Sequence, residues 1–90
     1  MGTVAARISR KLQAELAPES LEVRDESAKH AGHMGARPEG ETHFEVRMTA
    51  SAFEGVSRLE RQRRINAILA EELAGPVHAL SLKLLAPSET

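Results

Sequence analysis

Apolar and polar residues alternate from His78 to Leu84, and this is the clearest pattern in the 90-residue chain. One side of the pattern is apolar after its first position: His78, Leu80, Leu82 and Leu84. A period of two is typical of a strand with one buried face. Gly75 and Pro76 end the element before it. The pattern predicts a strand whose inward face begins with a histidine, where the core meets solvent.

Two more segments alternate in the same way. Residues 21–24 predict a first strand that extends to about residue 27, and residues 42–49 predict a second strand. The second strand has an apolar inward side and a polar outward side, namely Phe44, Val46 and Met48 against His43, Glu45 and Arg47. Between them, residues 28–41 contain Gly, His and Pro without a period. Long loops in compact domains are usually functional or mobile, so this loop is a candidate site.

Two segments with helical spacing predict amphipathic helices. The first has Thr3 as a candidate N-cap, ends before Pro18 and places an apolar residue at every fourth position: Val4, Ile8, Leu12 and Leu16. The second follows a capping box from Ser57 to Glu60. It ends at Gly75 and is expected to bury Ile65, Ile68, Leu69 and Leu73.

The order of elements is helix, strand, strand, helix, strand. The first two strands are predicted to form an antiparallel hairpin, and the helical crossover makes the second and third strands parallel. A three-stranded mixed sheet with both helices on one face is a two-layer α/β sandwich of the α+β type. We expect a single domain over residues 1–90, with its core at about residues 4–87 and a short tail at 86–90.

The composition limits the classes of function. Hydrophobic residues make up 41% of the chain and only two residues are aromatic, which predicts a globular domain with a small aliphatic core. The net charge of −1 gives no overall attraction to nucleic acid or anionic membrane. There is no cysteine, so disulfides and thiolate sites built from this chain alone are excluded. No apolar run approaches the roughly 18 residues of a membrane span. The basic N-terminal segment has the spacing of a folded helix, so we expect a cytoplasmic protein.

The histidines are the first candidates for chemistry: His30, His33, His43 and His78. Two of them lie in the loop that leads into the second strand. Because parallel strands begin at the same end of a sheet, these loop histidines can converge with His78. Converging imidazoles suit zinc, copper or one iron of a cluster, and the missing ligands would have to come from a partner. The alternatives are solvated loop histidines and a hydrogen-bonded histidine at the core edge. His43 is expected to point outward as a surface residue.

The second helix begins with four arginines that are candidates for binding phosphate or an acidic partner: Arg58, Arg61, Arg63 and Arg64. The alternative is a solvated helix face with acidic neighbours. No aromatic platform accompanies the arginines, which weakens the case for single-stranded nucleic acid. No nucleophile is paired with a base, so the sequence predicts no enzyme.

Seven short motifs resemble, in the same order, those of the BolA family, and the resemblance runs from about Val4 to Pro87. They are Asp25-Glu26-Ser27, His30, Glu41-Thr42-His43-Phe44, Phe53-Glu54-Gly55, Arg61-Gln62-Arg63, Ala70-Glu71-Glu72-Leu73 and Val77-His78-Ala79-Leu80. The resemblance implies a fold like that of class II KH domains, in agreement with the order of elements above. The chain departs from the family at Gln62, where the family has histidine, and in a longer loop that contains His33.

The resemblance also implies a partner, a monothiol glutaredoxin of the Cys-Gly-Phe-Ser type. Such pairs share a bridging [2Fe–2S] cluster, to which the glutaredoxin contributes its cysteine and glutathione. The BolA-like chain contributes the histidine of the Val-His-Ala-Leu motif and a loop ligand, here His78 with His30 or His33. The implied function is a non-enzymatic adaptor or regulator in iron–sulfur cluster trafficking or iron homeostasis. Some members are described as DNA-binding transcriptional regulators, so DNA binding by the arginine-rich helix is the alternative. We expect the free chain to be a monomer or weak dimer.

Overall fold

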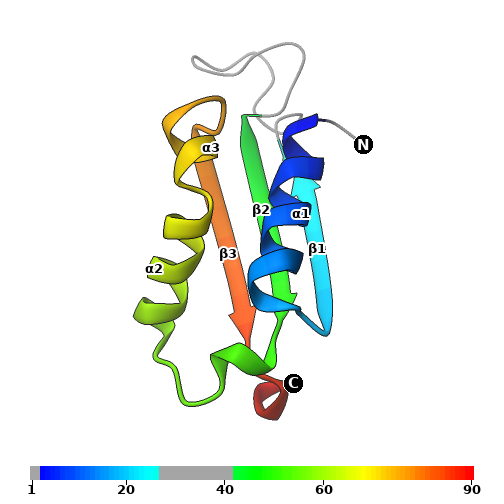
Figure 1. Ribbon diagram of the computed structural model, residues 1–90, viewed down its shortest axis with the longest axis vertical. Coiled ribbons are helices and arrows are strands. Elements are labelled where there is room, and N and C mark those ends of the chain that lie inside the picture. Colours follow the sequence, from blue (N-terminus) through cyan, green and yellow to red (C-terminus); the bar gives the residue numbers. More distant parts are fainter. Residues whose placement is uncertain (1–2, 27–41) are drawn as a thin grey trace.

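A computed structural model describes residues 3–26 and 42–90, and its elements follow the predicted order (Figure 1). The helices and strands are α1 Thr3–Leu16, β1 Ser20–Asp25, β2 His43–Thr49, α2 Arg58–Ile68, α3 Ala70–Ala74 and β3 Ala79–Leu85. Two short 3₁₀ turns cover Ser51–Phe53 and Pro87–Glu89. None of the described helices is both long enough and apolar enough to cross a membrane.

The three strands form one mixed sheet in the order β1-β2-β3. β1 and β2 are antiparallel, with Ser20 opposite Thr49, and β2 and β3 are parallel, with His43 opposite Ala79. Both predicted pairings are therefore confirmed. Because β2 and β3 begin in register, the residues that precede and open these strands lie at one end of the sheet. Figure 1 shows α3 at this end and the 3₁₀ turns at the other.

The core lies between the sheet and the helices. α1 packs against β1, and α2 packs against β3. The inward residues Phe44, Val46 and Met48 of β2 are buried against Ile8 of α1 and Ile65 of α2. Burying one such side chain stabilises the fold by roughly 1.5–3 kcal/mol. The opposite face of the sheet carries the polar positions, so the two-layer α+β arrangement follows from the period of two.

The predicted second helix is interrupted. Leu69, with φ −100° and ψ 21°, separates α2 from α3, so the expectation of one helix ending at Gly75 is wrong. The chain kinks without forming a loop, because Leu69 N still donates to the carbonyl of Ile65 at 2.9 Å. The kink keeps the side chain of Leu69 in the core. α3 is therefore a separate five-residue helix directly before the turn into β3.

The helix starts were predicted with mixed success. The Oγ of Ser57 accepts a hydrogen bond from the amide of Glu60 at 3.1 Å, which confirms the N-cap of α2. Thr3 is the first residue of α1, within the helix, and so is not its cap. α1 is followed by Ala17, whose positive φ of 43° is unusual for a residue other than glycine.

Candidate functional site

Thr42 joins the beginnings of β2 and β3. Its side chain is fully buried, and its carbonyl accepts hydrogen bonds from the amides of His78, at 2.7 Å, and Ala79, at 3.2 Å. Its Oγ1 lies 2.9 Å from Nδ1 of His43. One buried threonine therefore holds both the backbone of His78 and the ring of His43.

The rings of His43 and His78 lie side by side. Their centroids are 6.4 Å apart and their planes differ by 20°. His78 is exposed and precedes β3, which begins at Ala79. The prediction that His78 opens the inward face of the strand is therefore wrong. The turn fixed by Thr42, and not the alternation of the strand, directs its imidazole toward the outward residue His43.

The structure pairs two histidines whose pairing the sequence did not predict. His30 and His33 lie outside the described residues, so their approach to His78 stays a prediction. His43 is on the outward side of β2, as the alternation predicts, and it is the histidine that the structure places beside His78. The sequence contained a signal for this pair, because Thr42-His43 opens β2 just as Val77-His78 leads into β3. Two parallel strands that begin in register bring such dipeptides together.

Two imidazoles provide two nitrogen donors, which zinc, copper and iron accept. In residues 3–26 and 42–90, no group of three or more His, Cys, Asp and Glu residues could hold a metal ion. A cavity of about 320 Å³ adjoins His43 and is lined also by Glu26, Glu45 and Ser81. Two imidazoles are too few to hold a metal ion by themselves, so a metal here would need further ligands from outside the described residues.

A cluster of buried charge lies at the same end of the fold, between α1 and α3. The carboxylate of Glu72 is 0% exposed, and its Oε2 lies 2.8 Å from Nη2 of Arg7. Nζ of Lys11 donates to Oε1 of Glu72 at 2.9 Å and to Oε1 of Glu71 at 3.0 Å. Burial alone raises the pKa of Glu72. The hydrogen bonds from Lys11 and from its own amide, with the charges of Lys11 and Arg7, outweigh burial and hold the pKa below its ordinary 4.5.

The four arginines of α2 do not form one surface. Arg61 is only 5% exposed, and its guanidinium donates to the carbonyls of Val56, at 2.8 Å, and Leu84, at 3.2 Å. It also forms a two-pronged contact with Glu89, at 2.6 and 3.2 Å, and lies 5.7 Å from the ring centre of Phe53. The expectation that Arg61 stands in an exposed basic cluster is therefore wrong. Arg61 can be buried because backbone carbonyls accept hydrogen bonds from its guanidinium.

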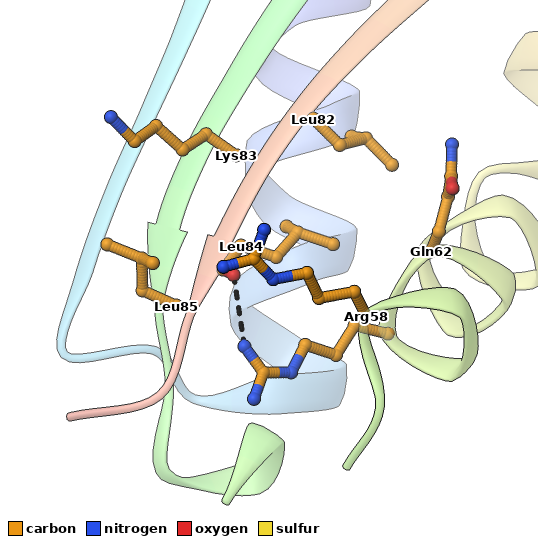
Figure 2. Close-up of a pocket in the computed structure, with 7 residues that line it drawn as sticks. Arg58, Gln62, Leu82, Lys83, Leu84 and Leu85 are labelled. Carbon is orange, nitrogen blue, oxygen red and sulfur yellow. Dashed lines mark hydrogen bonds between the residues drawn. The ribbon is translucent and has the colours of Figure 1, made fainter. Parts of the chain in front are cut away.

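The other three arginines, Arg58, Arg63 and Arg64, are exposed. Arg58 lines a cavity of about 260 Å³ between α2 and β3, together with Gln62 and Lys83 (Figure 2). The apolar floor of this cavity comes from the last residues of β3. Three of the four predicted arginines are therefore exposed, and Arg58 is the one among them that lines the cavity, where Lys83 adds a further cation.

These features define a small α+β domain with a pair of imidazoles at one end of a mixed sheet. A family model described as BolA-like protein matches residues 12–89. The chain belongs to the BolA family.

The relatives share both sequence and fold. BolA-like protein 1 of Pongo abelii is 51% identical over 89 residues, which are 99% of this chain and 62% of the relative, so the chain spans about three fifths of that protein. The BolA domain of SufE1 from Arabidopsis thaliana has a TM-score of 0.89 at 43% identity and covers 100% of this chain and 99% of that one. The solution structure of BolA1 from Mus musculus has a TM-score of 0.81 at 43% identity, covering 98% and 68%. The mixed α+β fold predicted from the sequence is that of the family.

Proposed function

We propose that this BolA-like chain is a non-enzymatic adaptor or regulator in iron–sulfur cluster trafficking or iron homeostasis. It acts as a heterodimer with a monothiol glutaredoxin of the Cys-Gly-Phe-Ser type and shares a [2Fe–2S] cluster with it. The observation that supports this function is the imidazole pair of His43 and His78, held by Thr42 at an exposed end of the sheet. Membership of the BolA family supports the type of partner.

The donor set fits one half of a shared cluster. Two imidazoles on one iron are the ligands of Rieske-type centres, in which thiolates hold the other iron. This chain has no cysteine, so the sulfur ligands must come from the partner's cysteine and glutathione. When bound, the cluster supplies the iron and sulfide that the complex stores or passes on.

Each described residue has a distinct task in this function. His78 is exposed and preceded by a fixed turn, so it can reach a ligand held by a second protein. The contact between Thr42 Oγ1 and Nδ1 of His43 orients the second ring. Protonation removes the lone pair that an imidazole donates, so the cluster should be lost on mild acidification. His43, His30 and His33 are the candidates for the second ligand.

The test is a titration of the chain into a cluster-loaded monothiol glutaredoxin, followed by visible absorption and circular dichroism. We expect a changed spectrum that saturates at one chain per glutaredoxin. His78→Ala should abolish the change while far-ultraviolet circular dichroism remains that of the folded protein. Lys83→Ala, at an exposed position of β3 away from His78, is the matched control. An unchanged glutaredoxin spectrum with the wild-type chain contradicts the function.

The second ligand is identified by three single variants, His30→Ala, His33→Ala and His43→Ala. The variant that removes the ligand should alter the cluster spectrum most, because it replaces an imidazole on one iron. If all three match the wild type, His78 is the only histidine ligand.

DNA binding is the second candidate function, and the groove of Arg58 and Lys83 favours it. Two cations beside a cavity can contact phosphates. On duplex DNA the affinity falls as the salt concentration rises, and each phosphate contact makes the slope of log affinity against log salt concentration more negative by about 0.9. Arg58→Ala combined with Lys83→Ala should therefore flatten that slope. Arg61 is unsuited to this test because its removal would disturb the core. Binding that is insensitive to the double change counts against the groove as a DNA site.

A further inference from the structure

Glu72 connects the buried charge cluster to the histidine site through its backbone. Its main-chain carbonyl accepts hydrogen bonds from the amides of Gly75, at 3.2 Å, and Val77, at 3.0 Å. Val77 is buried in the core and directly precedes His78. The same residue whose carboxylate is held by α1 therefore also binds, through its carbonyl, the turn between α3 and the histidine.

α3 depends on tertiary contacts for its position. A helix of five residues is not stable by its local hydrogen bonds alone. The kink at Leu69 separates it from α2, so α2 constrains its direction only in part. Leu69 anchors the beginning of α3 in the core. The carboxylate of Glu72, which lies beside two cations of α1, anchors the middle of α3.

A charged anchor defines the orientation of α3 more closely than an apolar contact can. Oε1 of the carboxylate accepts a hydrogen bond from Lys11, and Oε2 lies within ion-pair distance of Arg7 and Lys11, at 2.8 and 2.9 Å, without a hydrogen bond of its own. Any movement of α3 along α1 would leave a fully buried carboxylate without its cations, which is costly. The contact therefore permits only a narrow range of positions for the turn that follows.

We propose that Glu72 is a positioning residue for His78. By holding α3 to Arg7 and Lys11, it sets where the imidazole of His78 lies relative to His43. Its consequence for cluster binding rests on the proposed function, whereas the position of His78 in the free chain does not. Glu72 itself contacts neither the histidines nor the cluster in this role.

The test compares Glu72→Gln with Glu71→Gln in the full chain. The two changes remove the same charge from neighbouring positions of α3, but Glu71 is 80% exposed and only its outer contact with Lys11 is lost. We expect Glu72→Gln to shift the amide and ring resonances of His78 in NMR spectra of the free chain. It should also weaken cluster sharing with the glutaredoxin by about tenfold, the lower end of the range for groups that orient metal ligands. Glu71→Gln should leave both readouts at their wild-type values.

A destabilised core variant distinguishes a positioning role of Glu72 from a purely structural one. Ile65→Val lowers stability at a site on α2 and should leave the His78 resonances in place at temperatures well below unfolding. If Glu72→Gln behaves like Ile65→Val, Glu72 only stabilises the fold and the proposal is wrong.

Two further outcomes are decisive. If Glu72→Gln does not fold, Arg7→Gln removes one of its cations from a half-exposed position and should shift the same resonances by a smaller amount. Unshifted His78 resonances in a folded Arg7→Gln protein then overturn the proposal. If the wild-type chain takes no cluster, the proposed function fails, while the NMR comparison still decides whether Glu72 positions His78.

Discussion

Two buried ionic groups hold the ends of this fold, and they differ in what surrounds them. At the end where β2 and β3 begin, the buried group is the carboxylate of Glu72, and its cations reach it from another helix. At the opposite end, the buried group is the guanidinium of Arg61, which binds two main-chain carbonyls and Glu89. Each charge is compensated, as the cost of burying an isolated charge requires.

The different surroundings of Arg61 and Glu72 suggest different roles, one in stability and the other also in the candidate site. The partners of Arg61 are the connector before α2, the end of β3 and the C-terminal turn, and neither His43 nor His78 is among them. The backbone of Glu72 leads directly into the turn that carries His78. We therefore expect changes at Arg61 to act on stability alone, and changes at Glu72 to act also on the imidazole pair.

The largest effect should follow from Arg61→Ala. The change leaves the carbonyls of Val56 and Leu84 without their donor and removes the ring contact with Phe53. Unfolding in urea should show a loss of about 2–4 kcal/mol, as for removal of one partner from a buried hydrogen-bonded pair. The exposed residue Arg63 provides the control, because Arg63→Ala should change stability by at most about 0.5 kcal/mol. A weakened cluster titration in folded Arg61→Ala would contradict the separation of the two ends.

The pH dependence of stability should distinguish the two carboxylates. The pKa of Glu89 is held below 4.5 by hydrogen bonds from Arg61 and the amide of Ala86, and the pKa of Glu72 is also lowered. A carboxyl whose folded pKa is depressed contributes stability above its unfolded pKa, and this is lost as pH falls through the folded pKa. Urea unfolding between pH 6 and 3 should therefore show a decline below about pH 4.5.

Single variants assign that decline to the two residues. Glu72→Gln should flatten the acid limb more than Glu89→Gln does, because the side chain of Glu89 is 37% exposed and water screens its contacts. Equal flattening by both variants would show that burial does not distinguish the two ends.

A smaller effect, confined to the histidine end, should follow from Thr42→Val. Valine keeps the carbonyl that binds His78 but lacks the Oγ1 beside His43. We expect cluster affinity to fall about threefold to tenfold. The free energy of unfolding should fall by about 1–3 kcal/mol, the range for losing one buried hydrogen bond. Thr42→Ser retains the hydroxyl and should restore the wild-type spectrum. If Thr42→Ser is as defective as Thr42→Val, the hydroxyl does not orient His43.

The smallest effect should be a gain in stability at the C-terminus of α1. Ala17 adopts a φ of 43°, which glycine tolerates better than alanine. Ala17→Gly should therefore raise the free energy of unfolding by about 0.5–1 kcal/mol, as measured in urea. The His78 resonances and the cluster titration should not change. A shift at His78 would show that α1 transmits strain to the site along its whole length.

The periodicity of the sequence predicted most of the fold, because each strand or helix with one buried face needs apolar residues at regular intervals along its own sequence. The alternation in residues 42–49 placed Phe44, Val46 and Met48 in the core, where the structure has them. The antiparallel and parallel pairings followed from the connections between the strands. The kink at Leu69 was not predicted, because the apolar spacing of the second helix continues through it without a break.

The site was predicted less completely because side-chain direction at its residues depends on distant partners. The sequence by itself placed His43 and His78 near the beginnings of two parallel strands, and the absence of cysteine excludes a thiolate site built from this chain alone. Only the tertiary structure paired His43 with His78, because the carbonyl of Thr42 accepts hydrogen bonds from the amides of His78 and Ala79. It also turned Arg61 inward and buried Glu72. A hydrogen bond or ion pair between residues far apart in the chain leaves no period in the sequence, so these contacts were decided by folding.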